Sequence, residues 1–152
     1  MKLVPLLGAL IALGLPVAAQ VPSSAQPEKV LGIGGFFFKA QDPDALARWY
    51  EKNLGISLLP SSYDAKPWRQ EAGPTAFAPF PDSTKYFGTP DRKWMLNFRV
   101  RDVAAMAAQL RASGITVTVD TTLYPNGRFA HLKDPEGNRI ELWQPMGRAA
   151  PK

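Results

Sequence analysis

Apolar and polar residues recur in the same order twice along the chain. In each half, an apolar run leads into an aspartate, apolar positions then return with helical spacing, and three short segments with strand character follow. These segments are residues 56–59, 66–70 and 75–80 in the first half, and residues 115–120, 128–133 and 139–144 in the second. The pattern predicts one βαβββ unit in each half.

Aspartate and glycine residues indicate where the two helices begin and end. Asp42 is a suitable N-cap because its carboxylate can accept a free backbone N–H, and Gly55 is placed to end the helix. Pro43 fits the first helical position, where no N–H is needed. Asp102 and Gly114 have the same roles in the second half. The predicted apolar faces are Ala45, Leu46, Trp49 and Tyr50 in the first helix, and Val103, Met106, Ala107 and Leu110 in the second.

The two halves align when the sequence is shifted by about 60 residues, as expected of an internal repeat. Helices cover one face of each small sheet, so the other face must meet its twin or another chain. Two curved sheets that face each other enclose a cleft, and clefts hold ligands. We therefore expect an α+β fold in which two βαβββ modules form a curved sheet around a cleft. Whether the modules pair within one chain or between chains is left open.

The N-terminal segment has the features of a secretory signal. Lys2 precedes an uncharged apolar stretch that ends in small residues of the kind a signal peptidase reads. The stretch is short for a membrane span, and an uncleaved anchor is the alternative. We expect a signal peptide at 1–19, a flexible leader at 20–28, a folded domain at 29–147 with modules at 30–88 and 93–146, and a tail at 148–152. The mature protein would be periplasmic or secreted, without a membrane segment.

Composition limits the chemistry that the chain can supply. It has no cysteine, which excludes disulfides, thiolate metal sites and cysteine nucleophiles, and it has one histidine, His131. The formal net charge of +5 arises from 18 Lys and Arg against 13 Asp and Glu, without a basic run. A charge spread in this way is typical of a solvated surface, so we expect no nucleic-acid partner.

Successive residues of a strand point to opposite faces, which predicts the side chains that face the cleft. Those side chains are Phe37, Lys39 and Phe77 from the first half, beside Gly35, and Met95, Asn97, Arg99, Glu141 and Trp143 from the second. The aromatic residues and Met95 would give the cleft an apolar floor for a flat or hydrophobic ligand, or would simply fill it. The basic residues near strand ends, which would form either a rim for an anionic ligand or a solvated surface, are Lys39, Arg99, Arg128 and Lys133.

The turn Asp134-Pro-Glu-Gly-Asn138 sets the pairing of the last two strands. The proline suits the second position of a type I turn, and Gly137 can adopt the left-handed conformation that closes a bulged hairpin. In that register His131 lies directly opposite Glu141, so both side chains share one face. We therefore predict that they lie side by side on the cleft wall. A turn without the bulge would shift the pairing by one residue and separate them.

Two stretches of the chain resemble a known superfamily. Residues 42–55, DPDALARWYEKNLG, and residues 127–143, GRFAHLKDPEGNRIELW, are similar to sequences of the vicinal oxygen chelate superfamily. That superfamily includes glyoxalase I, bleomycin-resistance proteins, fosfomycin-resistance transferases and extradiol dioxygenases. The resemblance covers about residues 30–145 and implies the glyoxalase/bleomycin resistance/dioxygenase fold, with a small molecule in its cleft.

The resemblance also implies metal-ligand positions, from which this sequence departs. Carried over residue by residue, these positions are Gly35, Phe77, Met95 and Glu141. Glu141 alone suits a divalent metal, with His131 as a weak second ligand, whereas zinc sites in proteins need about three protein ligands. We therefore expect no cofactor, and a divalent metal is the alternative.

His131 and Glu141 are the candidate catalytic residues. Glu141 would orient the imidazole, which would move a proton on a bound carbonyl or enediol-like compound; alternatively, the two form a structural pair left from a metal site. The leading interpretation is an exported small-molecule-binding protein. The alternatives are a metal-dependent glyoxalase-type lyase or isomerase, and a homodimer that sequesters a drug. Loop aromatic residues would form either a lid or a dimer contact, and they are Tyr63, Trp68, Tyr86, Phe87 and Trp94.

Overall fold

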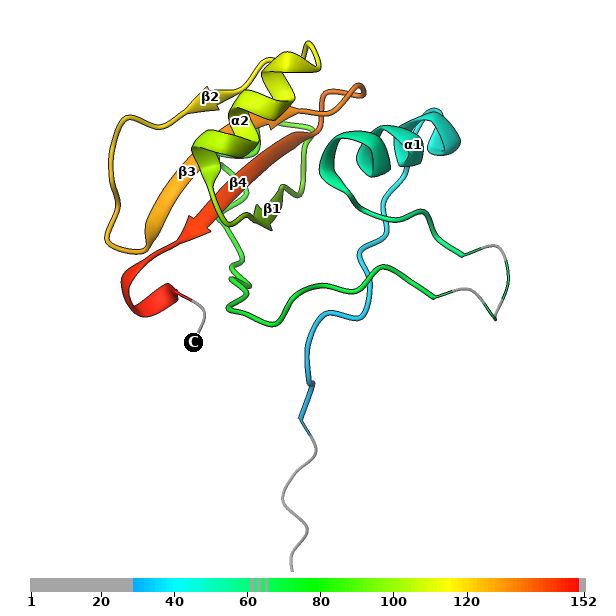
Figure 1. The fold of residues 1–152 in the computed structure, drawn as a ribbon, viewed down its shortest axis with the longest axis horizontal. Coiled ribbons are helices and arrows are strands. Elements are labelled where there is room, and N and C mark those ends of the chain that lie inside the picture. Colours follow the sequence, from blue (N-terminus) through cyan, green and yellow to red (C-terminus); the bar gives the residue numbers. More distant parts are fainter. Residues whose placement is uncertain (1–28, 61, 63, 65, 151–152) are drawn as a thin grey trace, which may run out of the picture. The chain divides into compact units, whose positions relative to one another are not determined.

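Figure 1 shows the fold in a computed structural model, which describes residues 29–60, 62, 64 and 66–150. The predicted signal peptide and leader lie outside the described residues. The chain divides into two units, Met1–Phe36 and Phe37–Lys152. In the first unit, the described residues 29–36 contain no helix or strand. No helix in the described part of the chain is long and apolar enough to cross a membrane.

A four-stranded sheet forms the centre of the second unit. Its strands are β1 (Leu96–Arg99), β2 (Thr118–Val119), β3 (Gly127–Lys133) and β4 (Arg139–Pro145), in the order β1-β4-β3-β2. β1 runs parallel to β4, whereas β3 is antiparallel to β4 and β2. Helix α2 (Val103–Ala112) connects β1 to β2, and the 3-10 helix η1 (Gly147–Ala149) follows β4. This is the βαβββ unit predicted for the second half, and the α+β fold class is confirmed.

Both helices begin and end as predicted. In α1 (Pro43–Leu54), the Ala45 N–H donates to the Asp42 carboxylate at 2.9 Å, and Gly55 follows in the left-handed conformation with φ of 69°. In α2, the Asp102 carboxylate accepts two backbone N–H groups, and Gly114 has φ of 79° after the helix end. Ala45 is exposed and does not belong to the buried face of α1, so the predicted apolar stripe was one residue too wide.

The core lies between the helices and one face of the sheet. Alternate residues of β3 and β4 point into it, and their neighbours along each strand face the other way. The buried apolar residues are Leu46 and Tyr50 from α1, Val103, Ala107 and Leu110 from α2, Val117, and Ala130, Leu132, Ile140 and Leu142 from the sheet. The helices thus cover one face of the sheet and leave its opposite face for other contacts.

The first half does not form the predicted strands. Among the described residues before β1, the structure contains helix α1 but no strand, including the segments 56–59, 66–70 and 75–80. Five prolines stand between residues 60 and 81. A proline has no N–H to donate to a neighbouring strand, so this segment is poorly suited to sheet pairing. The prediction of a second set of paired strands in this half was therefore wrong for the chain described here.

The turn between β3 and β4 has the predicted bulged form. The Gly137 N–H donates to the Asp134 carbonyl at 3.0 Å, Gly137 has φ of 78°, and the Asp134 N–H donates to the Asn138 carbonyl at 3.1 Å. The Asp134 side chain is buried and accepts hydrogen bonds from two backbone N–H groups, from the Asn138 amide and, at 2.9 Å, from the Tyr50 hydroxyl. The turn carboxylate therefore joins the hairpin to helix α1.

A second carboxylate of the turn reinforces this connection. Glu136 accepts hydrogen bonds from the backbone N–H groups of Gln41 and Asp42 at the start of α1, at 2.9 and 3.0 Å. Arg92 donates to the Asn138 side chain at 2.6 Å and to the Glu136 carbonyl at 3.0 Å. The turn motif that carries much of the superfamily resemblance thus connects the β3–β4 hairpin to helix α1 in this protein.

Replacing Tyr50 by phenylalanine should reduce the loss of folding stability that occurs at alkaline pH. Burial, and then the neighbouring Asp134 carboxylate, raise the pKa of Tyr50 well above its usual value of 10.0. The unfolded chain releases this proton above pH 10 while the folded chain retains it, so the stabilisation is complete below pH 10 and is lost as the pH rises further. Above pH 10, we expect Tyr50 to lower the free energy of unfolding of the wild type by up to about 1.4 kcal/mol for each pH unit.

Urea unfolding between pH 8 and pH 11 measures this slope directly. Tyr50→Phe should be less stable than wild type at pH 8 by about 1 kcal/mol, because a buried hydrogen bond to a carboxylate is lost. The difference between the two proteins should then narrow above pH 10. Parallel slopes for the two proteins over this range would show that the Tyr50 hydroxyl does not hold its proton in the folded state.

Candidate functional site

Four side chains form a row across the open face of the sheet. His131 on β3 pairs with Glu141 on β4, as predicted from the turn. Asn97 on β1 lies beside Glu141 on the other side, and Thr118 on β2 lies beside His131. Directly paired residues of neighbouring strands share a face, so the row crosses all four strands. The structure therefore brings together both candidate catalytic residues and one of the predicted ligand contacts.

Glu141 is held firmly in place at the centre of this row. Its side chain is 7% exposed. One carboxylate oxygen accepts a hydrogen bond from the Tyr86 hydroxyl, and the other accepts one from the Asn97 side-chain amide. A buried carboxylate needs such donors to offset the loss of water. Both oxygens therefore have defined partners, which fixes the orientation of the carboxylate.

His131 lies between two carboxylates. Its Nε2 atom is 3.3 Å from Asp120 Oδ1, and its Nδ1 atom is 3.9 Å from Glu141 Oε1. Nδ1 is buried and has no hydrogen-bond partner among the residues that the structure describes. A neutral imidazole with its proton on Nε2 would donate to Asp120 and leave Nδ1 as an acceptor. The contact with Asp120 is thus suited to orienting the ring, the task that the sequence had assigned to Glu141.

Asp120 was not identified from the sequence as a site residue. Its backbone N–H donates to the Phe129 carbonyl at 3.0 Å, next to the pairing of Thr118 with His131. The side chain therefore lies on the same face as the imidazole. No short turn connects β2 to β3, so the sequence does not fix the register of these two strands. The alternation of Thr118 and Asp120 along the predicted strand 115–120 is the signal that could have placed both side chains on one face.

Tyr86 is the second residue of the site that sequence reasoning did not place. It was one of five loop aromatics with no position assigned. In the structure its hydroxyl donates to Glu141, and its ring meets the His131 ring edge-on, with centroids 6.3 Å apart. Burial, and then the hydrogen bond to Glu141, raise the pKa of the Tyr86 hydroxyl above its usual value. The hydroxyl therefore remains a proton donor to the carboxylate.

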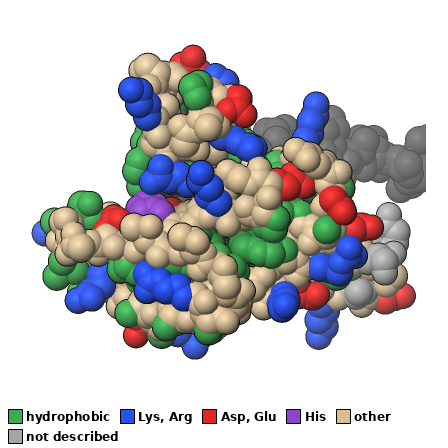
Figure 2. All heavy atoms as spheres, turned by 90° about the horizontal axis from the view of Figure 1, so that it is seen from above, with side chains coloured by type: hydrophobic (Ala, Val, Ile, Leu, Met, Phe, Trp, Pro, Cys, Tyr) green, Lys and Arg blue, Asp and Glu red, His purple; other side chains and the backbone are tan. Residues whose placement is uncertain are grey.

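A cavity of about 680 Å³ opens beside His131, and we call it the His131 cavity. Residues that line it include Thr118 and His131 from the row, Gly88 from the loop before β1, and the basic residues Lys133 and Arg139. In Figure 2 the histidine (purple) is seen at a hollow of the surface, with basic side chains (blue) close by. The predicted rim residue Lys133 thus lines the same cavity as His131, whereas Glu141 is not among the lining residues.

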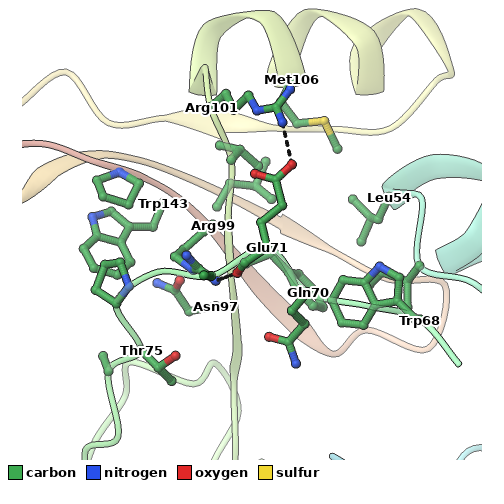
Figure 3. A pocket seen from close by; sticks show the side chains of 18 of the residues that line it. Leu54, Trp68, Gln70, Glu71, Thr75, Asn97, Arg99, Arg101, Met106 and Trp143 are labelled. Carbon is green, nitrogen blue, oxygen red and sulfur yellow. Dashed lines mark hydrogen bonds and ion pairs between the residues drawn. The ribbon is translucent and has the colours of Figure 1, made fainter. Parts of the chain in front are cut away.

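A second cavity, of about 610 Å³, lies between β1 and the segment 68–76, and we call it the Trp68 cavity (Figure 3). Three of the residues predicted to contact a ligand line it together, and they are Asn97, Arg99 and Trp143. Arg99 donates to the Glu71 carbonyl at 2.6 Å. Trp143 is buried, and its indole N–H donates to the Asn126 carbonyl at 2.9 Å. Asn97 belongs to this cavity and also to the row that contains Glu141.

Three residues that were predicted to form the apolar floor of the cleft do not line either cavity. Phe37 and Phe77 are 87% and 86% exposed, so they do not form an apolar floor. Their segments pair with no strand among the described residues, which removes the alternation that was expected to point them inward. Met95 precedes β1 and is half-buried, and the β1 residue paired with Glu141 is Asn97. The predicted rim residues Lys39 and Arg128 are exposed.

The donors near Glu141 are arranged around an imidazole and do not converge on a single point. The two ring nitrogens of His131 lie toward different carboxylates, Asp120 and Glu141. Within the described ranges, no group of three or more His, Cys, Asp or Glu side chains is arranged to hold a metal ion. Of the metal positions implied by the resemblance, Phe77 is exposed and Gly35 belongs to the other unit of the chain.

The chain is similar to a known protein family and to solved structures. The model of a glyoxalase-like domain matches residues 35–143. No curated protein is significantly similar to the chain. A glyoxalase/bleomycin resistance protein from Streptomyces sp. CB03234 is 41% identical over 32% of this chain and 42% of its own, with a TM-score of 0.30. An antibiotic binding protein from the same source is 25% identical over 69% of this chain and 88% of its own, with a TM-score of 0.43.

Proposed function

Because the chain belongs to the glyoxalase-like domain family, we propose that it is an exported protein that binds a small molecule against His131 and Glu141. The observation that carries this proposal is the buried Nδ1 atom of His131, which has no hydrogen-bond partner among the described residues. A buried polar atom without a partner costs about 1–3 kcal/mol. A ligand group that reaches this nitrogen would supply the missing hydrogen bond.

The surroundings of His131 favour a ligand that carries a hydrogen-bond donor. In a neutral imidazole whose proton is on Nε2, toward Asp120, the Nδ1 atom is an acceptor, and Glu141 Oε1 at 3.9 Å is another. A hydroxyl or N–H group in this position would be able to serve either acceptor. The adjoining His131 cavity of about 680 Å³ has the size of small-molecule sites in general. Lys133 and Arg139 at its wall suit a ligand with some negative charge.

Proton transfer on the bound compound is the second candidate function, and the contact with Asp120 favours it. A carboxylate that orients one imidazole nitrogen leaves the other free to act as a general base. His131 Nδ1 would then take a proton from a carbon next to a carbonyl group of the ligand and return it elsewhere. The residues in reach of such a reaction are Asp120, His131 and Glu141.

The family resemblance implies a metal, but the donors of this chain do not fit one. A site for zinc or a similar ion needs about three protein ligands around one point. Here Glu141 is already hydrogen-bonded to Tyr86 and Asn97, and His131 lies between two carboxylates. We therefore propose binding without the metal site of the superfamily. Elemental analysis of protein purified without chelators tests this, and a stoichiometric divalent metal would contradict it.

Export and self-association are parts of the same proposal. Export is supported by the sequence of residues 1–19, and the N-terminal sequence of the secreted protein should begin at Gln20. A homodimer is supported by the large apolar side chains that the first half exposes, among them Phe37, Leu59 and Phe77. Light scattering of the purified protein measures the oligomeric state, and a monomer at all concentrations would contradict this part.

Ligand binding is tested by a thermal-shift and calorimetric screen of small carbonyl compounds and aromatic compounds. We expect at least one compound to stabilise the wild type, and His131→Ala and Glu141→Gln each to weaken its binding about tenfold or more, since a buried hydrogen bond is lost. Asp82→Asn is the control. Asp82 is exposed and pairs with Lys93, which is also exposed, and neither residue belongs to the proposed site. Unchanged binding in both site variants would contradict the proposed site.

A further inference from the structure

The Tyr86 side chain occupies the space directly against both residues proposed to contact the ligand. Its hydroxyl donates to Glu141, whose other oxygen is held by Asn97. Its ring lies edge-on to His131, at 86° between the ring planes. A side chain in this position either completes the site or occupies the place of a ligand.

The contacts around the Tyr86 ring are those that a bound phenol would need. Phe80 stacks on the ring with centroids 5.7 Å apart and planes 3° from parallel. The Arg139 guanidinium lies over the ring, 5.4 Å from its centroid. Stacking and a cation over the ring face stabilise an aromatic ring of any origin. The Glu141 carboxylate adds an acceptor for the hydroxyl, and a hydrogen bond to an ionised group is among the stronger kinds.

Tyr86 is attached to the fold through a loop that is able to move without breaking the sheet. The side chain is 39% exposed, and the loop between α1 and β1 contains no helix or strand in its described part. Near Tyr86 the backbone hydrogen bonds are those of turns, such as the Gly88 N–H to the Lys85 carbonyl at 3.2 Å. Gly88 itself has φ of 101°, a conformation that other residues rarely adopt.

We propose that the His131 and Glu141 site recognises ligands that carry a phenol group, and that Tyr86 occupies the phenol position until such a ligand displaces it. This inference rests on the proposed function and specifies its ligand class. A tethered side chain is a strong competitor because its effective concentration is high. A ligand gains over Tyr86 where a second donor group beside its phenol hydroxyl reaches His131 Nδ1, which has no hydrogen-bond partner among the described residues.

The test is the binding of phenol itself, measured by calorimetry and by NMR, to wild type and to Tyr86→Ala. We expect Tyr86→Ala to bind phenol at least about tenfold more tightly than wild type, because the internal competitor is gone. Toluene and anisole, which lack the hydroxyl, should show no such gain. The gain should also disappear in the double variant Tyr86→Ala with Glu141→Gln, because the acceptor of the hydroxyl is weakened.

Phe87→Ala is the matched control. Phe87 is the next residue of the loop and contacts Phe80 with centroids 5.1 Å apart, whereas the ring contact with His131 and the hydrogen bond to Glu141 are made by Tyr86. This variant should bind phenol as weakly as wild type. If Tyr86→Ala does not fold, Tyr86→Phe replaces it, and this variant should bind phenol about threefold more tightly than wild type, since the hydroxyl no longer competes.

The proposal is overturned if the Tyr86 variant that folds shows no gain for phenol, if it gains equally for toluene, or if the gain survives in the Glu141→Gln background. A different compound that binds with dependence on His131 and Glu141, while phenols do not bind, would overturn the ligand class and leave the proposed function in place. Absence of any ligand that depends on those two residues would overturn the proposed function as well.

Discussion

Asp134→Ala should lower the free energy of unfolding by about 4 kcal/mol, since several buried donors lose their acceptor at once. The Asp134 carboxylate accepts hydrogen bonds from the Tyr50 hydroxyl, from the backbone N–H groups of Glu136 and Asn138, and from the Asn138 side chain. Alanine fills none of these roles. Because small domains are stable by about 5–15 kcal/mol, this change should bring the protein close to unfolding at physiological temperature.

Urea unfolding measured by fluorescence provides the comparison, with Asp134→Asn and Asp82→Ala beside it. Asp134→Asn retains one acceptor oxygen and should cost about half as much as the alanine variant. Asp82 forms an ion pair with Lys93 at 2.7 Å, but both side chains are exposed, so Asp82→Ala should leave the free energy of unfolding nearly unchanged. A similar cost for Asp134→Ala and Asp82→Ala would show that the turn does not fasten the hairpin to α1.

The second half of the chain was predictable because local rules fix its geometry. The turn Asp134–Asn138 indicates the register locally, since its proline and Gly137 favour a bulged hairpin, and the structure has that register. The capping aspartate and the spacing of Val103, Ala107 and Leu110 then define α2 and the face it buries. The turn register placed His131 opposite Glu141, and strand alternation placed both side chains on the face away from the core.

The first half was not predictable in the same way. Its helix α1 is defined by local signals, and it begins and ends as expected. Its strands were inferred by analogy with the second half, but a strand needs a partner and free N–H groups, and the prolines between residues 60 and 81 remove several. As a consequence, the positions assigned to Phe37 and Phe77 depended on pairings that the described chain does not contain.

The incomplete prediction of the site has a related cause. His131, Glu141 and Asn97 lie on strands of known register, so their proximity follows from pairing. Tyr86 reaches Glu141 from a loop 55 residues away in the sequence. No periodic pattern determines where a loop side chain points, because the conformation of a loop depends on its contacts with the rest of the fold. The residue that bears most directly on ligand choice was therefore the one that sequence patterns could not place.

Gly127→Ala should destabilise the protein by about 3 kcal/mol or more, because the new methyl group would meet backbone that has no room to move. Gly127 begins β3 with φ of 143°, and a Cβ atom there would lie 2.1 Å from the Gln144 carbonyl oxygen and 2.8 Å from the Trp143 indole nitrogen. The end of the β3 and β4 pairing would have to open. Trp143 would then lose its place at the Trp68 cavity.

The cost of Gly127→Ala has two causes, the positive φ of the glycine and the clash of the new Cβ atom. Gly55→Ala and Gly114→Ala separate them. Both glycines have positive φ, at 69° and 79°, but an added Cβ would meet nothing within 4 Å at either position. These variants should therefore show backbone strain alone, about 1 kcal/mol each. Urea unfolding gives the stabilities. Because the chain has four tryptophans, the part of the folded-state fluorescence that is lost in Trp143→Phe reports on Trp143. If Gly127→Ala costs no more than Gly55→Ala and leaves the fluorescence unchanged, β3 and β4 do not approach as closely at this end as the structure indicates. If it costs more and alters the fluorescence, the close approach of the two strands at Gly127 is what holds Trp143 against the cavity.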